Sequence, residues 1–178
     1  AKLVLGGKSL ALVGFCDAVW VGDAMDRRST TCYVFMLGGE ALSWNFKKQP
    51  TIALSTTEAE YMAISQCARE AIWLRQLLSD VGLEQERSTR IMCDNQGAIA
   101  LVKNPIHHSR SKHIDIQHHF IREKVEEDVI EMRYISTELM VADVLTKALG
   151  KPRHGNLCKD MGLTLFGNKQ SGSVEDIE

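Results

Sequence analysis

The chain has 178 residues, enough for one domain with a sizeable core or one domain plus tails. Its composition, 44% hydrophobic and 25% charged, is ordinary for a globular protein. The sequence contains no run of about 18 apolar residues, the length that predicts a membrane span. The net charge of −2 excludes a protein that holds nucleic acid by overall positive charge. Any nucleic-acid binding would have to be local or assisted by metal ions.

Neither the cysteines nor the N-terminus indicate a secreted protein. The five cysteines are odd in number, far apart and never form a C-x-x-C pair, which argues against a disulfide framework and against a zinc site. The first fifteen residues lack the basic, apolar and small-residue pattern of a signal peptide. We therefore expect reduced core thiols in a cytosolic or nuclear protein.

Three extended segments are expected at the start of the chain. Residues 10–20 (LALVGFCDAVW) are β-rich, and alternation places Asp17 on an otherwise apolar face. An acid inside such a strand is unusual. Residues 30–39 and 40–46 are predicted to be the second and third strands, joined by a Gly-Gly hairpin signal.

A long helix is predicted over residues 55–81, with Gly82 as its C-terminal stop. Ser55, followed three residues later by Glu58, fits a capping box, in which the Ser side chain accepts from the third helical N–H and the Glu side chain reaches back to the cap. Glu58 is therefore expected to have a structural role.

Glu60, two residues further, is predicted to lie on a different face of the same helix. Because successive helical residues are rotated by roughly 100°, Glu58 and Glu60 cannot face the same partner. Helical spacing from Glu60 gives an almost wholly apolar stripe: Ile64, Cys67, Ala71, Leu74 and Leu78. The same spacing from Glu58 gives a stripe of more exposed character: Met62, Ser65, Arg69, Ile72 and Gln76. Glu60 is therefore the acid at the end of the buried face, pointing towards the strand that carries Asp17.

The second half of the chain predicts alternating strands and helices. They are a strand at 89–95, a helix at 96–104, a basic, His-rich link at 106–115, a helix at 114–127, a strand at 129–135 and a helix at 138–149. A meander followed by βα units predicts an α/β fold, a mixed sheet with helices on its faces. We expect one domain over residues 10–150, preceded by a connection at 1–9 and followed by a partly disordered tail at 151–178.

Asp17, Asp94 and Asp143 each lie in an apolar context at the end of a predicted strand or helix. Taken singly, each is better explained as a cap or a paired structural carboxylate. Two of them, however, lie on strands that a βα architecture makes neighbours, near the strand ends where open α/β sheets place their ligands. Crowded carboxylates need a cation, and oxygen ligands suit Mg²⁺ or Mn²⁺. Two such ions would support phosphoryl transfer on a phosphodiester.

Several strings of the sequence resemble one family. They are FCDAVWVGDAMDRRSTTCYVFMLGGEALSWNFKKQPTIALSTTEAEYMA, WLRQLL, CDNQGAIALVKNPIHHSRSKHIDIQHHFIRE and STELMVADVLTKAL. They are similar to the ribonuclease H domain at the C-terminal end of the Pol polyproteins of copia-type (Pseudoviridae-like) LTR retrotransposons. The resemblance covers residues 10–150, nearly the whole expected domain.

The resemblance implies the RNase H-like fold, in which a five-stranded mixed sheet, three antiparallel strands and then parallel strands, is flanked by helices. It also implies cleavage of the RNA strand of RNA–DNA hybrids with two Mg²⁺ or Mn²⁺ ions, and a reverse transcriptase domain in the same polyprotein. The family's catalytic, metal-binding acids match Asp17, Glu60, Asp94 and Asp143. Such a domain is expected in cytoplasmic virus-like particles, with the nucleus as the alternative.

Contacts with the substrate are implied less specifically. Gln96 falls where related domains contact the minor groove of the hybrid, and Asn95 precedes it. In the basic link Lys103–His113, Arg110 and Lys112 are candidates for phosphate contacts, and a solvated loop explains this link equally well. The three tryptophans are expected in the core rather than on a stacking surface.

The chain departs from the family at two points. Residues 134–143 (YISTELMVAD) lack the mobile histidine found after the fifth strand of many RNase H enzymes, which leaves proton transfer unassigned. Val19 replaces an acid that is common in the family but is not one of the four. Two rival functions stay open: a catalytically silent or domesticated binding module, and another nuclease or integrase-like transferase with the same fold.

Overall fold

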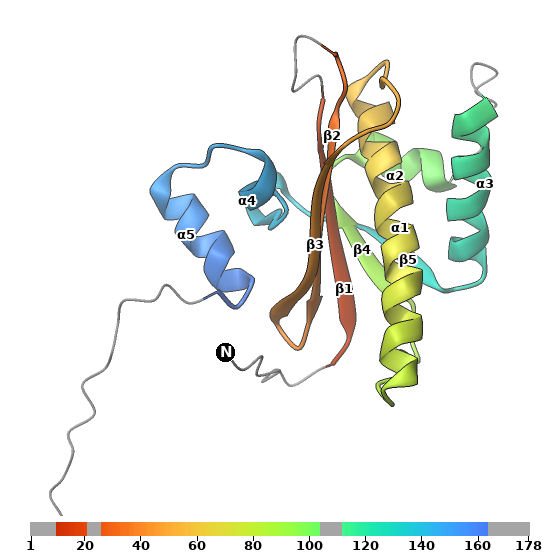
Figure 1. The fold of residues 1–178 in the computed structure, drawn as a ribbon, viewed down its shortest axis with the longest axis vertical. Coiled ribbons are helices and arrows are strands. Elements are labelled where there is room, and N and C mark those ends of the chain that lie inside the picture. Colours follow the sequence, from red (N-terminus) through yellow and green to blue (C-terminus); the bar gives the residue numbers. More distant parts are fainter. Residues whose placement is uncertain (1–9, 21–25, 104–111, 164–178) are drawn as a thin grey trace, which may run out of the picture.

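The computed structural model describes residues 10–20, 26–103 and 112–163, and of residues 112–118 it describes the backbone alone. These residues form one mixed sheet with helices on both faces (Figure 1). The strands are β1 (Leu12–Val19), β2 (Thr30–Leu37), β3 (Glu40–Lys48), β4 (Thr89–Cys93) and β5 (Ile130–Tyr134). The helices are α1 (Thr56–Asp80), α2 (Gln96–Lys103), α3 (Lys112–Glu126), the 3₁₀ turn η1 (Thr137–Leu139), α4 (Asp143–Thr146) and α5 (Lys151–Asp160).

The strands lie in the order β3-β2-β1-β4-β5. The pairs β1–β2 and β2–β3 are antiparallel, whereas β1–β4 and β4–β5 are parallel. The expected α/β arrangement, three antiparallel strands followed by parallel ones, is therefore confirmed. Gly38 and Gly39 join β2 to β3 with positive φ angles of 64° and 88°, the conformation that a tight hairpin turn requires. The parallel pairing brings the carboxyl ends of β1 and β4 to the same edge of the sheet.

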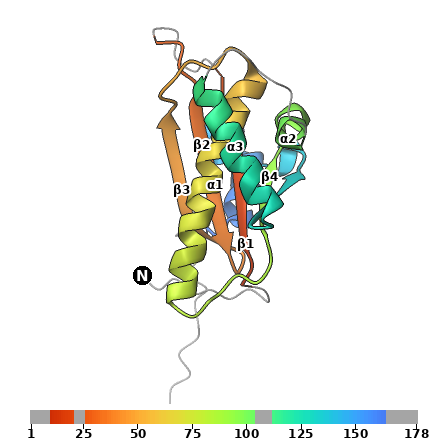
Figure 2. The same cartoon turned by 90° about the vertical axis from the view of Figure 1, so that its right-hand side faces the viewer.

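Each face of the sheet has its own apolar core. Helices α1, α2 and α3 cover one face, and α4 and α5 lie on the other (Figures 1 and 2). The larger core, under α1, includes Phe35, Ile64 and Ile91. The smaller core, under α4 and α5, consists of the buried residues Cys32, Val34, Met140, Val141, Ala142, Leu157 and Met161. Because both faces are covered, β2 is buried along almost its whole length instead of alternating.

Helix α1 begins and ends as the sequence predicts. The Ser55 hydroxyl accepts a hydrogen bond from the Glu58 N–H at 3.2 Å, as in a capping box. The Glu58 carboxylate accepts one at 2.8 Å from the N–H of Leu54, one residue before the expected partner Ser55. At the other end, Gly82 has a φ of 79°, which favours glycine and terminates the helix. Glu58 thus stabilises the start of the helix.

The two predicted stripes of α1 differ less in burial than expected. The stripe that starts at Glu60 is buried throughout and forms part of the larger core, as predicted. Along the stripe from Glu58, however, Met62 and Ser65 are only 3% and 1% exposed, so the predicted exposure is wrong there. The chain preceding the helix folds back, and Ala53 packs against Met62.

The helix predicted over residues 138–149 is broken into two short pieces, η1 and α4. Between them Met140 is extended, with φ of −71° and ψ of 98°. Met140, Val141 and Ala142 are each 3% exposed or less. In a continuous helix three successive side chains point in directions roughly 100° apart and cannot all face one core. The break lets all three enter the smaller core, and it places Asp143 at the start of α4.

No helix is predicted beyond residue 150, yet α5 continues the fold. Leu157 and Met161 are 2% and 4% exposed in the smaller core. The Met161 carbonyl accepts a hydrogen bond from the Ala41 N–H of β3 at 3.0 Å. Residues 1–9 and 164–178 lie outside the described residues, so the predicted connection and the predicted disordered end stay predictions.

Predictions of burial for cysteine and tryptophan have opposite outcomes. The five cysteines are free thiols, and all but the partly buried Cys158 are buried, as expected. Trp20, Trp44 and Trp73 were expected in the core, but they are 45%, 63% and 58% exposed. Trp44 lies on the edge strand β3, and Trp73 lies on the outer face of α1. Among the described residues, no helix combines the length and apolar character needed to cross a bilayer.

Candidate active site

Glu60 extends from the second turn of α1 into the space beside the sheet. The residue is 7% exposed, and its Oε2 atom is buried without a hydrogen-bond partner. Burial raises the pKa of Glu60 to about 10, and the neighbouring Asp17, Cys93 and Asp94 add to this increase. A buried carboxyl group in this situation requires a proton or a cation.

Asp17 and Asp94 lie at the same level of two neighbouring parallel strands. Phe15 of β1 pairs with Met92 of the parallel strand β4. Asp17 follows Phe15 by two residues, and Asp94 follows Met92 by two residues. Adjacent strands are about 4.8 Å apart, so the two acids reach the same edge of the sheet. Asp17 is 1% exposed, whereas Asp94, just beyond the end of β4, is partly exposed.

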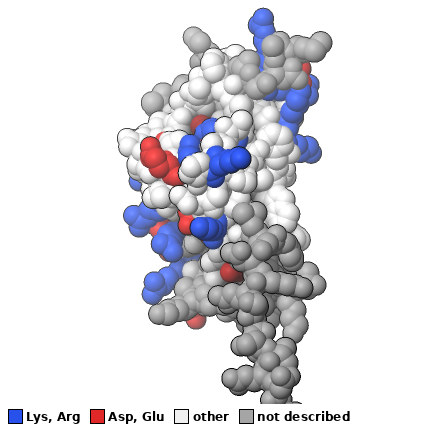
Figure 3. All heavy atoms as spheres, turned by 90° about the vertical axis from the view of Figure 1, so that its left-hand side faces the viewer, with Lys and Arg blue, Asp and Glu red and all other residues white. Residues whose placement is uncertain are grey.

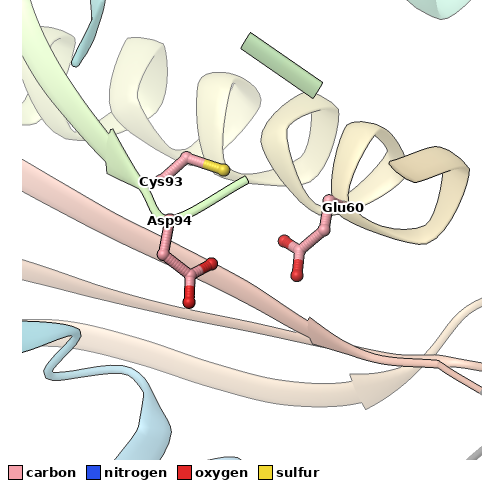
Figure 4. Close-up of side chains that lie close together, drawn as sticks. All are labelled: Glu60, Cys93 and Asp94. Carbon is pink, nitrogen blue, oxygen red and sulfur yellow. The ribbon is translucent and has the colours of Figure 1, made fainter. Parts of the chain in front are cut away.

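Glu60, Cys93 and Asp94 each offer one ligand atom within 4.8 Å of the other two. In Figure 4 the carboxylates of Glu60 and Asp94 point to the same side, whereas the sulfur of Cys93 turns toward α1. A hydrogen bond with Cys16 and burial raise the pKa of the Cys93 thiol. A protonated thiol is a poor ligand for a hard cation. The two carboxylates are therefore the candidate ligands on this side.

Asp143 approaches Asp17 from the opposite face of the sheet, and a lysine lies between them. Asp143 is fully buried at the start of α4. The Lys147 ammonium, one turn later, is 2.6 Å from Asp143 Oδ1 and 3.4 Å from Asp17 Oδ2. The Thr146 hydroxyl also donates to Asp17 Oδ2 at 2.8 Å. These two acids therefore have a cation supplied by the protein itself.

Two further residues complete the polar surroundings of the acids. Arg153 of α5 donates to Asp143 Oδ2 and to the Thr137 carbonyl. The Thr137 hydroxyl in turn donates to Asp94 Oδ2 at 2.8 Å. Groups from η1, α4 and α5 thus support the carboxylates from the side of the smaller core. Figure 3 views this side of the molecule, where Lys and Arg side chains are more prominent than Asp and Glu.

Electrostatic effects join the four acids into one cluster. Burial raises the pKa of Asp143; Lys147 lowers it and Asp17 raises it again, with a net increase. The pKa of Lys147 is raised in spite of its burial, because Asp143, Asp17 and Asp94 favour its charged form. Asp17 thus affects both Glu60 and Asp143, and Lys147 interacts with three of the acids. The structure brings together all four acids that the sequence singles out, and their catalytic role stays a prediction.

Of the predicted substrate contacts, only two can be placed. Asn95 Oδ1 accepts a hydrogen bond from the Ala98 N–H at 2.9 Å, so this side chain caps α2. Gln96 is exposed next to it, at the start of the helix. Arg110 lies outside the described residues, and for Lys112 the structure describes the backbone alone.

Lys147, Arg153 and Thr137 are not among the site residues predicted from the sequence. Lys147 could have been found, because it follows Asp143 by four residues and so lies on the same face of a helix. Arg153 and Thr137 carry no comparable signal. Their positions depend on α5, which is not predicted, and on the break before α4, which sequence periodicity does not show.

A basic groove of about 540 Å³ lies between α1 and the β2–β3 hairpin. Its charged lining residues are Arg28, Lys47, Lys48, Arg69 and Glu70. One of these cations, Lys48, is 2.8 Å from Asp26, so part of the positive charge is already balanced. The groove is nevertheless a locally positive surface on a chain whose net charge is −2.

The register of the sheet places this groove close to the acids. Asp17 pairs with Cys32 of β2, and Cys32 pairs with Phe46 of β3. Lys47 follows Phe46 and pairs with Thr31, the partner of Ala18. Its backbone therefore lies one residue beyond the level of Asp17 and two strands away, about 10 Å across the sheet.

Comparison with curated proteins finds Pol polyproteins. The chain is 43% identical over 159 residues to the retrovirus-related Pol polyprotein from transposon TNT 1-94 of Nicotiana tabacum, and 40% identical over 158 residues to that from transposon RE1 of Arabidopsis thaliana. The chain is a homologue of the copia-type retrotransposon Pol polyproteins. Each alignment covers 89% of this chain but only 12% and 11% of the two relatives, so the chain spans about a ninth of their length. No protein-family model matches it.

Solved structures with the same fold include ribonucleases H. LC11-RNase H1 in complex with an RNA/DNA hybrid has a TM-score of 0.52 at 10% identity, covering 72% of this chain and 88% of that one. The N-terminal RNase H domain of rv2228c from Mycobacterium tuberculosis has a TM-score of 0.52 at 11% identity, covering 85% and 98%. At these identities the likeness shows the fold. The chain therefore has the RNase H fold that the sequence strings imply.

Proposed function

We propose that this chain is the ribonuclease H part of a retrotransposon Pol polyprotein and that it cleaves the RNA strand of RNA–DNA hybrids during reverse transcription. The observation that carries the proposal is the convergence of Asp17, Glu60, Asp94 and Asp143 at one edge of the sheet. Homology to Pol polyproteins and the RNase H fold support it.

The donor set of the site fits a hard divalent cation. Glu60 has a buried oxygen without a hydrogen-bond partner, and it shares a ligand cluster with Asp94. Carboxylate oxygens are ligands that Mg²⁺ and Mn²⁺ accept. We propose that these two acids, with Asp17 and Asp143, hold two such ions. When bound, the ions would supply an activated water and stabilise the leaving oxygen of the phosphodiester.

The protein's own side chains prepare this site. Lys147 offsets the repulsion between Asp17 and Asp143, and the Thr146 hydroxyl orients Asp17 at the end of β1. Glu60 is delivered by a helix whose first turn is capped independently by Glu58. The acids therefore come from separately stabilised elements and are directed at one edge of the sheet.

The proposed substrate is an RNA–DNA hybrid, the ligand named for LC11-RNase H1. Because the chain carries a net charge of −2, contacts with the phosphate backbone have to be local. The basic groove with Arg28, Lys47 and Arg69 provides such a surface beside the acids. Discrimination against duplex DNA would rest on contacts with the ribose 2′-OH of the cleaved strand.

A cleavage assay with matched variants tests the proposal. Purified protein with Mg²⁺ or Mn²⁺ should nick a labelled RNA–DNA hybrid and leave duplex DNA intact. Asp17→Asn should abolish nicking, whereas Asp80→Asn, which removes an exposed acid at the far end of α1, should retain it. Absence of nicking by the wild-type chain, or equal nicking by Asp17→Asn, would disprove the proposal.

A second candidate function is a catalytically silent or domesticated module that binds nucleic acid. It is favoured by the ion pairs of Asp17 and Asp143, which balance half of the cluster without a metal ion. Titration calorimetry with Mn²⁺ separates the candidates, because a silent module would show no carboxylate-dependent binding. Cleavage or joining of DNA in place of hybrid cleavage would instead indicate another nuclease or an integrase-like transferase.

The proposed partner in the parent polyprotein is a reverse transcriptase domain. The Prototype Foamy Virus protease–reverse transcriptase shares the fold with a TM-score of 0.50 at 10% identity, over 92% of this chain and 22% of that chain. We further propose that the protein resides in cytoplasmic virus-like particles, with the nucleus as the alternative. Fractionation of cells that express the element, followed by immunoblotting for this chain, tests the location: sedimentation apart from particles would contradict it.

A further inference from the structure

Helix α5 holds one arginine at a fixed place beside the acids. The helix is anchored through Leu157 and Met161 in the smaller core, and through the hydrogen bond from the Ala41 N–H of β3 to the Met161 carbonyl. Arg153 lies in the first turn of this anchored helix. The backbone position of Arg153 is therefore determined by packing that does not involve the carboxylates.

This guanidinium is connected to acids on both sides of the cluster. It donates directly to Asp143 Oδ2, a carboxylate with 0% exposure. It also donates to the Thr137 carbonyl, and the Thr137 hydroxyl donates to Asp94 Oδ2 at 2.8 Å. Hydrogen bonds between charged groups are stronger than neutral ones, and burial strengthens them further. One side chain of α5 thus restrains Asp143 directly and Asp94 through one intermediate residue.

Arg153 and Lys147 contact Asp143 in different ways. The Lys147 ammonium pairs with Asp143 Oδ1 and also lies 3.4 Å from Asp17 Oδ2, so it is placed between two of the acids. The Arg153 guanidinium donates to Asp143 Oδ2, and its second acceptor is the backbone carbonyl of Thr137. Lys147 therefore balances charge within the cluster, whereas Arg153 restrains the position of Asp143 from the side of α5.

We propose that Arg153 is a positioning residue for the metal-binding carboxylates, and that the functional unit accordingly includes α5, beyond the predicted boundary at residue 150. The inference rests on the proposed metal-dependent function of the four acids. Residues that orient metal ligands through hydrogen bonds typically change metal affinity by about 10- to 100-fold when they are replaced. Arg153 acts on Asp143 and, through Thr137, on Asp94.

The test compares Mn²⁺ affinity among variants, measured by calorimetry well below the unfolding temperature of each protein. Arg153→Met should weaken Mn²⁺ binding about 10-fold, and Arg153→Lys should restore part of the affinity. Lys159→Met is the matched control: it removes a positive charge from an exposed position of the same helix and should leave Mn²⁺ affinity unchanged. Circular dichroism monitors whether the helices stay folded.

A second variant covers the possibility that Arg153→Met unfolds. Thr137→Val keeps the carbonyl that Arg153 contacts and removes only the hydroxyl bonded to Asp94 at an exposed position. It should also weaken Mn²⁺ binding, by a smaller factor. Wild-type affinity in folded Arg153→Met, or in Thr137→Val if Arg153→Met unfolds, would overturn the inference. Failure of the proposed function would be seen separately, as absence of Mn²⁺ binding by the wild-type chain, and it would overturn the positioning role as well.

Discussion

The two halves of the carboxylate cluster differ in how their charge is balanced. On the α1 side, Glu60 has a buried oxygen without a partner, and Asp94 accepts one hydrogen bond from a threonine hydroxyl. On the α4–α5 side, Asp17 and Asp143 receive hydrogen bonds and ion pairs from three neighbouring side chains. Among the described residues, lysine and arginine form ion pairs with the second half, through Lys147 and Arg153, and none is paired with Glu60 or Asp94.

This difference separates two physical tasks within one site. A buried carboxylate with an oxygen that lacks a hydrogen-bond partner lowers the free energy of unfolding unless it is protonated or bound to a cation. On the α1 side, the charged Glu60 carboxylate therefore lowers the free energy of unfolding of the metal-free protein, and a bound cation would raise it. The α4–α5 side is balanced in the absence of any ligand, which keeps its acids in place. The predictions below test whether the two halves behave in this way.

The largest expected effect is on cleavage by Glu60→Gln. Replacing a metal-binding carboxylate by a neutral amide should remove several kcal/mol of transition-state stabilisation, a loss of about 10³-fold in rate. Glu58→Gln, two residues away on the same helix, should cleave at the wild-type rate because the Glu58 carboxylate is bonded to the Leu54 N–H at the helix start. Single-turnover kinetics on a labelled hybrid measures both. The reverse result would mean that the wrong glutamate is assigned to the site.

The second prediction concerns the pH dependence of stability in the metal-free protein. The folded-state pKa of Glu60 is raised to about 10 by burial, above its unfolded value. Between these two pKa values the folded state holds one more proton, so wild-type stability should fall relative to Glu60→Gln as pH rises from about 5 to about 9. The slope cannot exceed about 1.4 kcal/mol per pH unit.

Chemical unfolding with a chelator present measures this slope. Saturating Mn²⁺ should reduce the slope for the wild type, because the ion favours the charged carboxylate. If the free energy of unfolding changed with pH in the same way for the wild type and Glu60→Gln without metal, the pKa of Glu60 would not be raised in the folded state. That result would contradict the prediction.

The third prediction concerns Lys147→Met, which removes the cation between Asp17 and Asp143. Breaking a buried pair costs about 3–5 kcal/mol, but the Lys147 side chain is 37% exposed. We therefore expect a loss of about 1–2 kcal/mol in the metal-free protein. Added Mn²⁺ should restore more stability to Lys147→Met than it adds to the wild type, as thermal unfolding with and without the ion would show. Equal gains would mean that Lys147 does not balance this half of the cluster.

The smallest expected effect is on the stability of α1. Glu58→Gln replaces one acceptor of the Leu54 N–H by a weaker, neutral one at the start of the helix. The loss in the free energy of unfolding should be about 1 kcal/mol or less, and denaturant unfolding measures it. A loss of several kcal/mol would show that the cap contributes more than its local hydrogen bonds.

The features that could be predicted from the sequence are those with a local signal. The cap at Ser55 and the stop at Gly82 depend on neighbouring residues, and both are observed. The apolar stripe of α1 follows from helical periodicity, and it identified Glu60 as the inward acid. By contrast, the break before Asp143 depends on how three successive apolar residues reach one core, which periodicity alone does not show.

By itself, the sequence was enough to predict the mixed α/β fold and the division between Glu58 and Glu60, because alternation, helical spacing and capping act over a few residues. It also singled out the four acids, through their apolar contexts and the family resemblance. Only the tertiary structure decided how each acid is balanced. Packing across both faces of the sheet brings Lys147 and Arg153 to Asp143 and leaves one oxygen of Glu60 buried without a hydrogen-bond partner. Electrostatic balance in a buried site depends on distances between residues far apart in the chain, and those distances exist only after the chain has folded.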